Sequence, residues 1–186
     1  MAVTQLDPRT ALIIVDLQKG IAGIVAPEII SDVVHKSREL ADAFRRKGLP
    51  VVLVTANGGA PGRAEQSRPL CDLPPDFTDI IPALGEQDQD IKVTKRTWGA
   101  FASTDLEQQL KVLEVSQVVI TGVATSIGVE STARQAYEAG FNVTLATDAM
   151  TDLRPEAHHA SIAYIFPRLG ETGTTDEIVA LLERSK

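Results

Sequence analysis

The sequence predicts an α/β fold, a three-layer, doubly wound domain in which helices flank a mostly parallel sheet. Short apolar runs rich in β-branched residues alternate with longer amphipathic stretches along the 186 residues, which is the pattern of successive βαβ units. Each run is too continuously apolar for a strand with one solvated face, so we expect parallel strands covered on both sides. No Pro-, Gly- or Ser-rich linker divides the chain, so residues 1–186 are expected to form a single domain.

Six segments are candidates for the strands of this sheet. Four are strongly apolar and are expected in its interior, a fifth is weaker and fits an edge, and the last is a short segment near Leu169. In chain order the first five are 11–15, 51–55, 91–94, 118–120 and 143–146, of which 91–94 is the weaker one.

Five helices are expected between and after these strands. Pro27 suits a first helical turn, and apolar residues then recur at helical spacing up to Gly48 as a stop. The other four helices are expected over about 106–113, capped by Ser103 or Thr104, and over about 127–139, 155–166 and 176–182. Residues 57–90 show little regular patterning and are expected to form a long loop, a kind of segment that often serves as a lid or a subunit contact.

The charge balance argues against nucleic acid as a partner. Eighteen basic and 25 acidic residues give a net charge of −7, whereas phosphate binding needs a clustered basic face. The basic cluster Arg45-Arg46-Lys47 lies at an expected helix end, where cations favour the carbonyl dipole, so it is interpreted as a solvated terminus.

The cysteine content and the N-terminal residues allow a prediction of the cellular compartment. Cys71 is the only cysteine and cannot form an internal disulfide, which favours a reducing interior. The first residues have no basic-then-apolar signal pattern, and no apolar run approaches the length of a membrane span. A cytoplasmic protein without a membrane partner is therefore expected.

Ligands of doubly wound sheets bind beyond the carboxyl ends of the strands, so candidate chemistry is sought there. Asp16 directly follows the apolar run 11–15. A carboxyl group that emerges from apolar surroundings has a raised pKa, which suits a proton donor or base. The alternative is that Asp16 caps a turn through its own backbone.

Lys95 follows the third expected strand, and Trp98 and Phe101 come soon after it. A lysine and a strand-end carboxylate beside apolar walls are the components of a small-molecule pocket. Two alternatives stay open: Lys95 belongs to a solvent-facing basic patch, and Trp98 and Phe101 join the core.

The segment from Gly122 to Gly128 leads from a strand through a turn into a helix. Amides at such a helix start can seat an anion or a developing oxyanion. The segment lacks the G-x-G-x-x-G pattern and a phosphate loop, so no dinucleotide or other cofactor is expected. Taken alone, Gly128 could equally be a glycine needed for close packing.

The histidines do not suggest a metal site. His35 lies mid-helix, and the adjacent His158 and His159 point to different faces of their helix. They are interpreted as exposed or core histidines. Cys71 has no neighbouring base to activate it and is interpreted as structural.

The chain resembles the isochorismatase-like (cysteine hydrolase) superfamily over essentially its whole length. Three matching segments occur in the right order: 11–18 with Asp16, 92–101 with Lys95, and 122–129. The stretch 127–134 is similar to a subgroup of bacterial members. The resemblance implies six parallel strands, a homodimer or homotetramer, and an Asp-Lys-Cys triad in which Asp16 and Lys95 match and Gly128 replaces the cysteine. It also implies a cis peptide between Val123 and Ala124 and a metal-free site, because the metal-binding residues of nicotinamidase-type members are not matched.

The favoured function is therefore a metal-free hydrolase of a small, anionic molecule, acting on an enol ether or another C–O or C–N bond. Asp16 would be the general acid and base, Lys95 would stabilise charge, and Gly128 would leave the nucleophile's place vacant. True isochorismatases also have glycine there, but they differ in the turn at 124–126, which leaves the substrate open. The expected substrate-binding residues are Gln18, Trp98, Phe101, Ala124, Thr125 and Ile127.

Two alternatives are kept. The chain could be a catalytically inactive relative that serves as a small-molecule binding or scaffold protein. It could also be a hydrolase that takes its nucleophile from elsewhere, for instance from Cys71 or Ser126.

Overall fold

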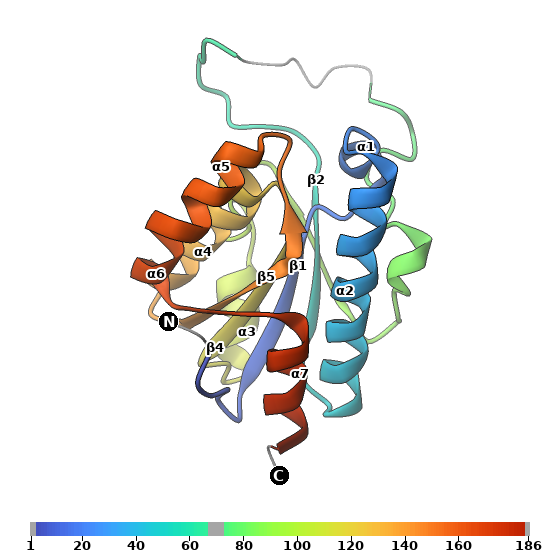
Figure 1. Cartoon of the computed structure of the whole chain (residues 1–186). Helices are drawn as coiled ribbons and strands as arrows, with labels where there is room; N and C mark the ends of the chain where they lie inside the picture. Colours follow the sequence, from blue (N-terminus) through green and yellow to red (C-terminus); the bar gives the residue numbers. More distant parts are fainter. Residues whose placement is uncertain (1–2, 67–72, 185–186) are drawn as a thin grey trace.

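A computed structural model describes residues 3–66 and 73–184 and contains one six-stranded sheet (Figure 1). The strand order is β3-β2-β1-β4-β5-β6, and every pair of neighbours is parallel. The strands are β1 (Thr10–Val15), β2 (Val51–Ala56), β3 (Ile91–Lys95), β4 (Gln117–Val123), β5 (Asn142–Thr151) and β6 (Glu171–Gly173). All six predicted strands are therefore confirmed, and β3 and β6 lie at the edges.

The burial of each strand follows its sequence pattern. The continuous apolar runs β1, β2 and β4 are buried at every position, as expected for strands that carry helices on both faces. The edge strand β3 alternates between exposed and covered residues instead. The polar positions of β3 therefore identified it correctly as an edge.

Helices cover both faces of the sheet (Figure 1). On one face, α2 (Pro27–Arg46) and α7 (Thr175–Arg184) bury side chains such as Phe44 and Leu182 against β1 and β2. On the other, α3 (Leu106–Val112), α4 (Glu130–Glu138) and α6 (Phe166–Leu169) bury Leu110, Ala133 and Phe166. None of the helices in the described part of the chain is both long and apolar enough to cross a membrane.

Two of the predicted helices contain a π-helical segment. The helix expected over 127–139 is the π-helix η2 (Thr125–Val129) followed by α4. The helix expected over 155–166 is α5 (Pro155–Ala160), the π-helix η3 (Ser161–Ile165) and then α6. Periodicity cannot reveal the extra residue of a π-turn, which frequently marks functional positions.

The connections agree with the prediction in part. Leu106 N donates to Thr104 Oγ1 over 3.2 Å, although α3 begins after Asp105. A short helix α1 (Lys19–Ala22) follows β1. The described parts of the predicted loop, 57–66 and 73–90, contain the short 3₁₀ helix η1 (Pro82–Leu84) and an antiparallel bridge from Ile80 to Gln18. Cys71 lies outside the described residues.

The interpretation of Arg45 as part of a solvated helix end was wrong. Its guanidinium makes two hydrogen bonds to Asp90, of 3.0 and 2.6 Å, and the two side chains are only 6% and 1% exposed. Asp90 immediately precedes β3, so the ion pair joins the end of α2 to the start of an edge strand. Sequence neighbours alone could not show this contact, because Arg45 and Asp90 lie 45 positions apart.

The topology determines where a ligand site can form. From β1 the chain winds outward through β2 to β3, then returns to place β4 on the other side of β1. The carboxyl ends of β1 and β4 therefore flank the point at which the winding reverses, which is the usual ligand position in such sheets.

Candidate active site

Asp16 is the first residue after β1, and its backbone is strained. Its φ angle is +55°, in the left-handed region that side-chain-bearing residues rarely adopt, although Asp tolerates it better than most. Asp16 N donates to Val54 O over 2.9 Å, which ties the residue to β2. The residue is 5% exposed. Strain of this kind is found most often at functional positions.

Gly122, near the end of β4, allows β4 to approach β1 closely. It pairs with Val15, and a β-carbon at position 122 would lie 2.0 Å from Val15 O. Its φ of +116° also favours glycine. The register between β4 and β5 shifts at this point, and the Val123–Ala124 peptide bond that follows is cis. The close approach of Gly122 to Val15 places the turn after β4 beside the end of β1.

Gly128, in η2, lies directly beside Asp16. A β-carbon on Gly128 would be 3.0 Å from Asp16 Oδ2 and 3.0 Å from Val123 O. These distances are shorter than most β-carbon contacts. Gly128 is therefore packed against the carboxylate, and a larger residue would require its neighbours to shift by a few tenths of an ångström.

Lys95, the last residue of β3, reaches across the end of β2 to the same carboxylate. Its Nζ donates to Asp16 Oδ2 over 2.8 Å, and to the carbonyl oxygens of Trp98 and Thr97 over 2.8 and 3.3 Å. Lys95 is 2% exposed. The solvent-facing alternative for Lys95 was therefore wrong: three acceptors compensate the burial of the ammonium group.

The Asp16 carboxyl group has an unusual protonation equilibrium. Burial raises its pKa from 3.8 to about 6, although the charge and the hydrogen bond of Lys95 lower it. Oδ2 is held by Lys95, whereas Oδ1 is buried without a hydrogen-bond partner among the described residues. An unpaired buried oxygen is costly, so it is a natural position for a proton or for a ligand's donor group.

Comparison with known proteins identifies the family. The isochorismatase domain model matches residues 10–177. The chain is 40% identical over 178 residues to the "Uncharacterized isochorismatase family protein YwoC" of Bacillus subtilis, covering 92% of this chain and 93% of that protein. It is 39% identical over 180 residues to the "Uncharacterized isochorismatase family protein YecD" of Escherichia coli O157:H7, covering 93% and 96%. This chain belongs to the isochorismatase family.

A solved structure supports the same conclusion for the fold of this isochorismatase-family protein. An isochorismatase family protein from Burkholderia thailandensis superposes with a TM-score of 0.93 at 39% identity, covering 98% of this chain and all of that one. The six-stranded parallel sheet flanked by helices is thus the family fold. The assignment of Gly128 to the position of the family's cysteine remains a prediction from the sequence.

The turn after β4 offers fewer amides to a ligand than predicted. Asp152 Oδ2 accepts hydrogen bonds from both Ser126 N (2.8 Å) and Ser126 Oγ (2.7 Å). The amides of Ile127 and Val129 both donate to Ala124 O. An anion seated in this turn would have to use the remaining amides, of Ala124, Thr125 or Gly128. The Ser126 hydroxyl donates its proton to the Asp152 carboxylate, and a role for Ser126 as nucleophile remains a prediction from the sequence.

Two residues predicted to bind substrate have structural roles instead. The Gln18 amide is fully buried and bonds to Ala56 N, Ala56 O and Phe77 O over 2.6–3.0 Å, so it ties β1 to β2 and to the long loop. Phe101 packs on Phe141 in the core, with ring centroids 5.9 Å apart. Its position follows from the backbone, since Phe101 N donates to Gln135 of α4 over 3.0 Å.

The other predicted ligand contacts differ in how far they are exposed. The Trp98 side chain is 64% exposed, so it is neither core nor a closed wall, and its carbonyl rather than its ring meets Lys95. Ile127 is 40% exposed, Ala124 is half-buried, and Thr125 is fully buried. Trp98 and Ile127 can therefore meet an incoming ligand, whereas the Thr125 side chain cannot.

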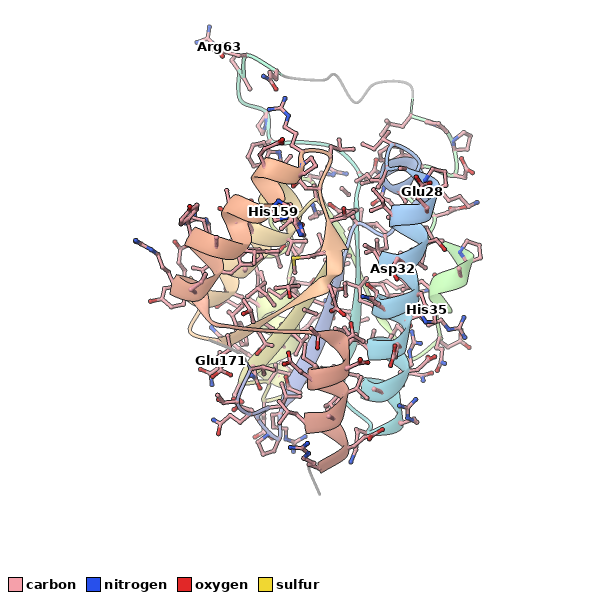
Figure 2. The ribbon with its side chains drawn as sticks, in the orientation of Figure 1. Glu28, Asp32, His35, Arg63, His159 and Glu171 are labelled. Atoms are coloured by element: carbon pink, nitrogen blue, oxygen red, sulfur yellow. The ribbon has the colours of Figure 1, made fainter. Side chains whose placement is uncertain are left out.

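Sequence reasoning missed Asp152 and His158. Asp152 directly follows β5, and the rule that identified Asp16 at a strand end would have found it. His158 Nδ1 lies 2.8 Å from Thr125 Oγ1, a contact between two helical segments that no local pattern indicates. The neighbouring His159 is exposed on α5, and exposed His35 lies along α2 with Glu28 and Asp32 (Figure 2).

No group of three or more His, Cys, Asp or Glu side chains that could hold a metal ion is found in residues 3–66 and 73–184. Metal independence remains a prediction from the sequence.

Proposed function

We propose that this isochorismatase-family protein is a hydrolase in which Asp16 serves as general acid and base without a thiol nucleophile. The observation that carries the proposal is a buried carboxyl group with a pKa of about 6, whose Oδ1 has no hydrogen-bond partner in the described part of the chain. Such a group is partly protonated near neutral pH, so it can both give and accept a proton. The favoured substrate is a small anion with an enol ether or another hydrolysable C–O or C–N bond.

For an enol ether, the carboxyl group acts in two steps. Asp16 Oδ1 transfers its proton to the alkene carbon, which leaves an oxocarbenium ion on the substrate and a carboxylate on Asp16. Water then adds to the cationic carbon as Asp16 takes back a proton, and the resulting hemiketal collapses to a carbonyl compound and an alcohol. Lys95, 2.8 Å from Oδ2, stabilises the carboxylate formed in the first step.

The charge of the site favours an anionic substrate. In the form that can donate a proton, Asp16 is neutral and Lys95 retains its positive charge, so the pair carries a net charge of +1. Both side chains are buried, and charges attract more strongly in such surroundings than in water. Asp152 already accepts the hydrogen bond of the Ser126 amide in the turn, so we assign the attraction for a negative substrate group mainly to Lys95.

A glycine at position 128 is consistent with a reaction that uses no thiol nucleophile at that position. A β-carbon there would press on Asp16 Oδ2, Val123 O and Val15 Cγ1 at 3.0–3.1 Å. Gly128→Cys is therefore expected to destabilise the protein by about 1–3 kcal/mol. If the thiol nonetheless gives new amidase activity, Asp16 and Lys95 are arranged as a thiol hydrolase requires.

The decisive experiment compares turnover by the wild type and Asp16→Asn. Purified protein is assayed with isochorismate and a panel of small anionic enol ethers, with dialysis against a chelator as a second arm. Asp16→Asn is expected to lower kcat about 10²–10⁴-fold, and chelation is expected to leave turnover unchanged. Equal activity of Asp16→Asn and wild type would refute the mechanism.

Asp79→Asn is the matched control for this experiment. Asp79 also pairs with a lysine, Lys19, over 3.0 Å, but the side chains of both are largely exposed. Its substitution removes an Asp–Lys pair far more accessible to water than Asp16 and Lys95. Activity close to that of the wild type is expected.

A non-catalytic binding protein is the second candidate. The Asp16–Lys95 ion pair is formed without a ligand, so it can stabilise the fold or a binding pocket even if the protein catalyses no reaction. This function predicts no product from the whole panel, together with a ligand-dependent rise in Tm. Turnover that depends on Asp16 would exclude it.

A further inference from the structure

The turn that carries Gly128 is fastened to α5 by a hydrogen bond between two side chains. Thr125 Oγ1 and His158 Nδ1 are 2.8 Å apart. One turn further along, Ser161 Oγ donates to Glu130 Oε2 over 2.6 Å. The two contacts join the region containing η2 and the start of α4 to the region containing α5 and the start of η3. The π-helices η2 and η3 therefore both take part in these contacts, through Thr125 and Ser161.

A hydroxyl beside an imidazole is also the arrangement of an activated nucleophile. Thr125 cannot have that role, because its side chain is fully buried and out of reach of a substrate. His158 is only half-buried. The pair is therefore suited to holding the backbone of the turn in place rather than to chemistry on the substrate.

The direction of this hydrogen bond follows from counting protons. Among the described residues, the Thr125 hydroxyl has a single partner, His158 Nδ1. The hydroxyl carries one proton that needs an acceptor, so the pair is satisfied when Thr125 donates and Nδ1 is unprotonated. Protonation of Nδ1 would leave the buried hydroxyl proton without an acceptor, which is unfavourable.

The surroundings of His158 agree with a neutral imidazole. Burial, followed by the neighbouring His159, lowers the pKa of His158, while Asp152 opposes the shift. The His159 ring lies edge-on at 5.4 Å. Glu130 faces α5 from the start of α4, but Ser161 and Arg134 hold its carboxylate.

We propose that His158 is a positioning residue for the candidate site: in its neutral form it accepts the Thr125 proton and holds the turn Thr125–Val129 against the end of β1. The consequence reaches Asp16 through Gly128, which lies against Asp16 Oδ2. When the turn loosens, water reaches the Asp16 carboxyl group. Its desolvation is then smaller, and its pKa falls. This inference rests on the proposed function, because the position of Gly128 affects catalysis only if Asp16 is the general acid.

The test measures the titration of the Asp16 carboxyl carbon by NMR, which requires no substrate. His158→Ala removes the acceptor, His158→Asn offers an amide oxygen near the place of Nδ1, and His159→Ala is the matched control on the same helix. In His158→Ala the Asp16 midpoint is expected to fall from about 6 toward 3.8 by about one unit. His158→Asn is expected to restore most of the wild-type value, and His159→Ala to retain it.

A second measurement follows the backbone amides of 125–130 in Asp16→Asn, in which Asp16 itself no longer titrates, as the pH is lowered. They are expected to shift together with a midpoint below 6.5, and His158→Asn in the same background is expected to abolish this step. The amide data decide the question if His158→Ala does not fold. An unchanged Asp16 midpoint in folded His158→Ala would overturn the proposal. Amide signals of 125–130 whose pH dependence is the same with and without His158 would also overturn it. Absence of turnover would instead count against the hydrolase function and leave this inference standing.

Discussion

Lys95 Nζ lies 2.8 Å from Asp16 Oδ2, although the two residues are 79 positions apart and come from strands separated by β2. Both side chains are buried, so each largely determines the electrostatic surroundings of the other. The pair therefore gives direct tests of the candidate site that do not depend on knowing its substrate.

Lys95→Met is expected to raise the pKa of Asp16 above about 6. The variant keeps a chain of similar length but removes the charge and the hydrogen bond that lower this pKa, while burial continues to raise it. Carboxyl-carbon NMR titration measures the midpoint. Lys92→Met, on the same strand but exposed and paired with Glu86, serves as control, and an unchanged midpoint in Lys95→Met would contradict the geometry.

Asp16→Asn is expected to change how stability depends on pH. The folded pKa of about 6 lies above the unfolded value of 3.8, so the folded protein binds more protons between these values. The contribution of Asp16 to stability is therefore fully present below pH 3.8 and is lost as the pH rises through about 6.

Relative to Asp16→Asn, the wild type should lose up to about 3 kcal/mol of unfolding free energy over this range. Urea unfolding of both proteins at several values between pH 3.5 and about 7 measures the difference. A difference that stays constant with pH would show that Asp16 titrates normally.

Gly122→Ala is expected to be severely destabilising. The added methyl group would lie 2.0 Å from Val15 O, at a φ of +116°. Gly140→Ala is the control, because Gly140 also has a positive φ, +88°, but has open space around its β-position. We expect a cost of about 1 kcal/mol for the control and at least about 3 kcal/mol for Gly122→Ala by urea unfolding. Equal costs would argue against the close approach of β1 and β4.

Asp90→Asn is expected to cost about 3 kcal/mol, because it leaves the buried Arg45 guanidinium paired only with Asp42, whose side chain is 36% exposed. Glu114→Gln disrupts the exposed Arg9–Glu114 pair, whose side chains are 65% and 76% exposed, and should cost less than about 1 kcal/mol. Thermal or urea unfolding compares the two. Similar small effects would indicate that water reaches Arg45.

Local sequence patterns were sufficient to predict the fold and two residues of the candidate site, Asp16 and Lys95. Apolar runs located β1, β2, β4 and β5, since strands buried on both faces of a parallel sheet are mostly apolar. The edge strands β3 and β6 were expected from a weaker run and from a short segment near Leu169. Asp16 and Lys95 were found by their places at strand ends, because parallel strands bring their carboxyl ends to one edge.

The missed features depend on contacts between distant segments. Gln18 resembled a ligand contact because it follows Asp16, but its amide is needed by the backbone of Ala56. The π-helical start at Thr125 coincides with a partner on α5, His158, which no periodicity in either segment shows. Asp152 was the exception, because it directly follows β5 and the strand-end rule applied to Asp16 could have predicted it.

The close contact between Val15 and Gly122 also bears on how such a protein can diversify. Main-chain atoms, rather than side chains, set the spacing between β1 and β4 at Val15 and Gly122, so substitution of Trp98 or Ile127 leaves that spacing intact. Trp98 and Ile127 are exposed, so their side chains are free of this constraint. Relatives can therefore exchange those two side chains to accept new molecules while the carboxylate stays where it is.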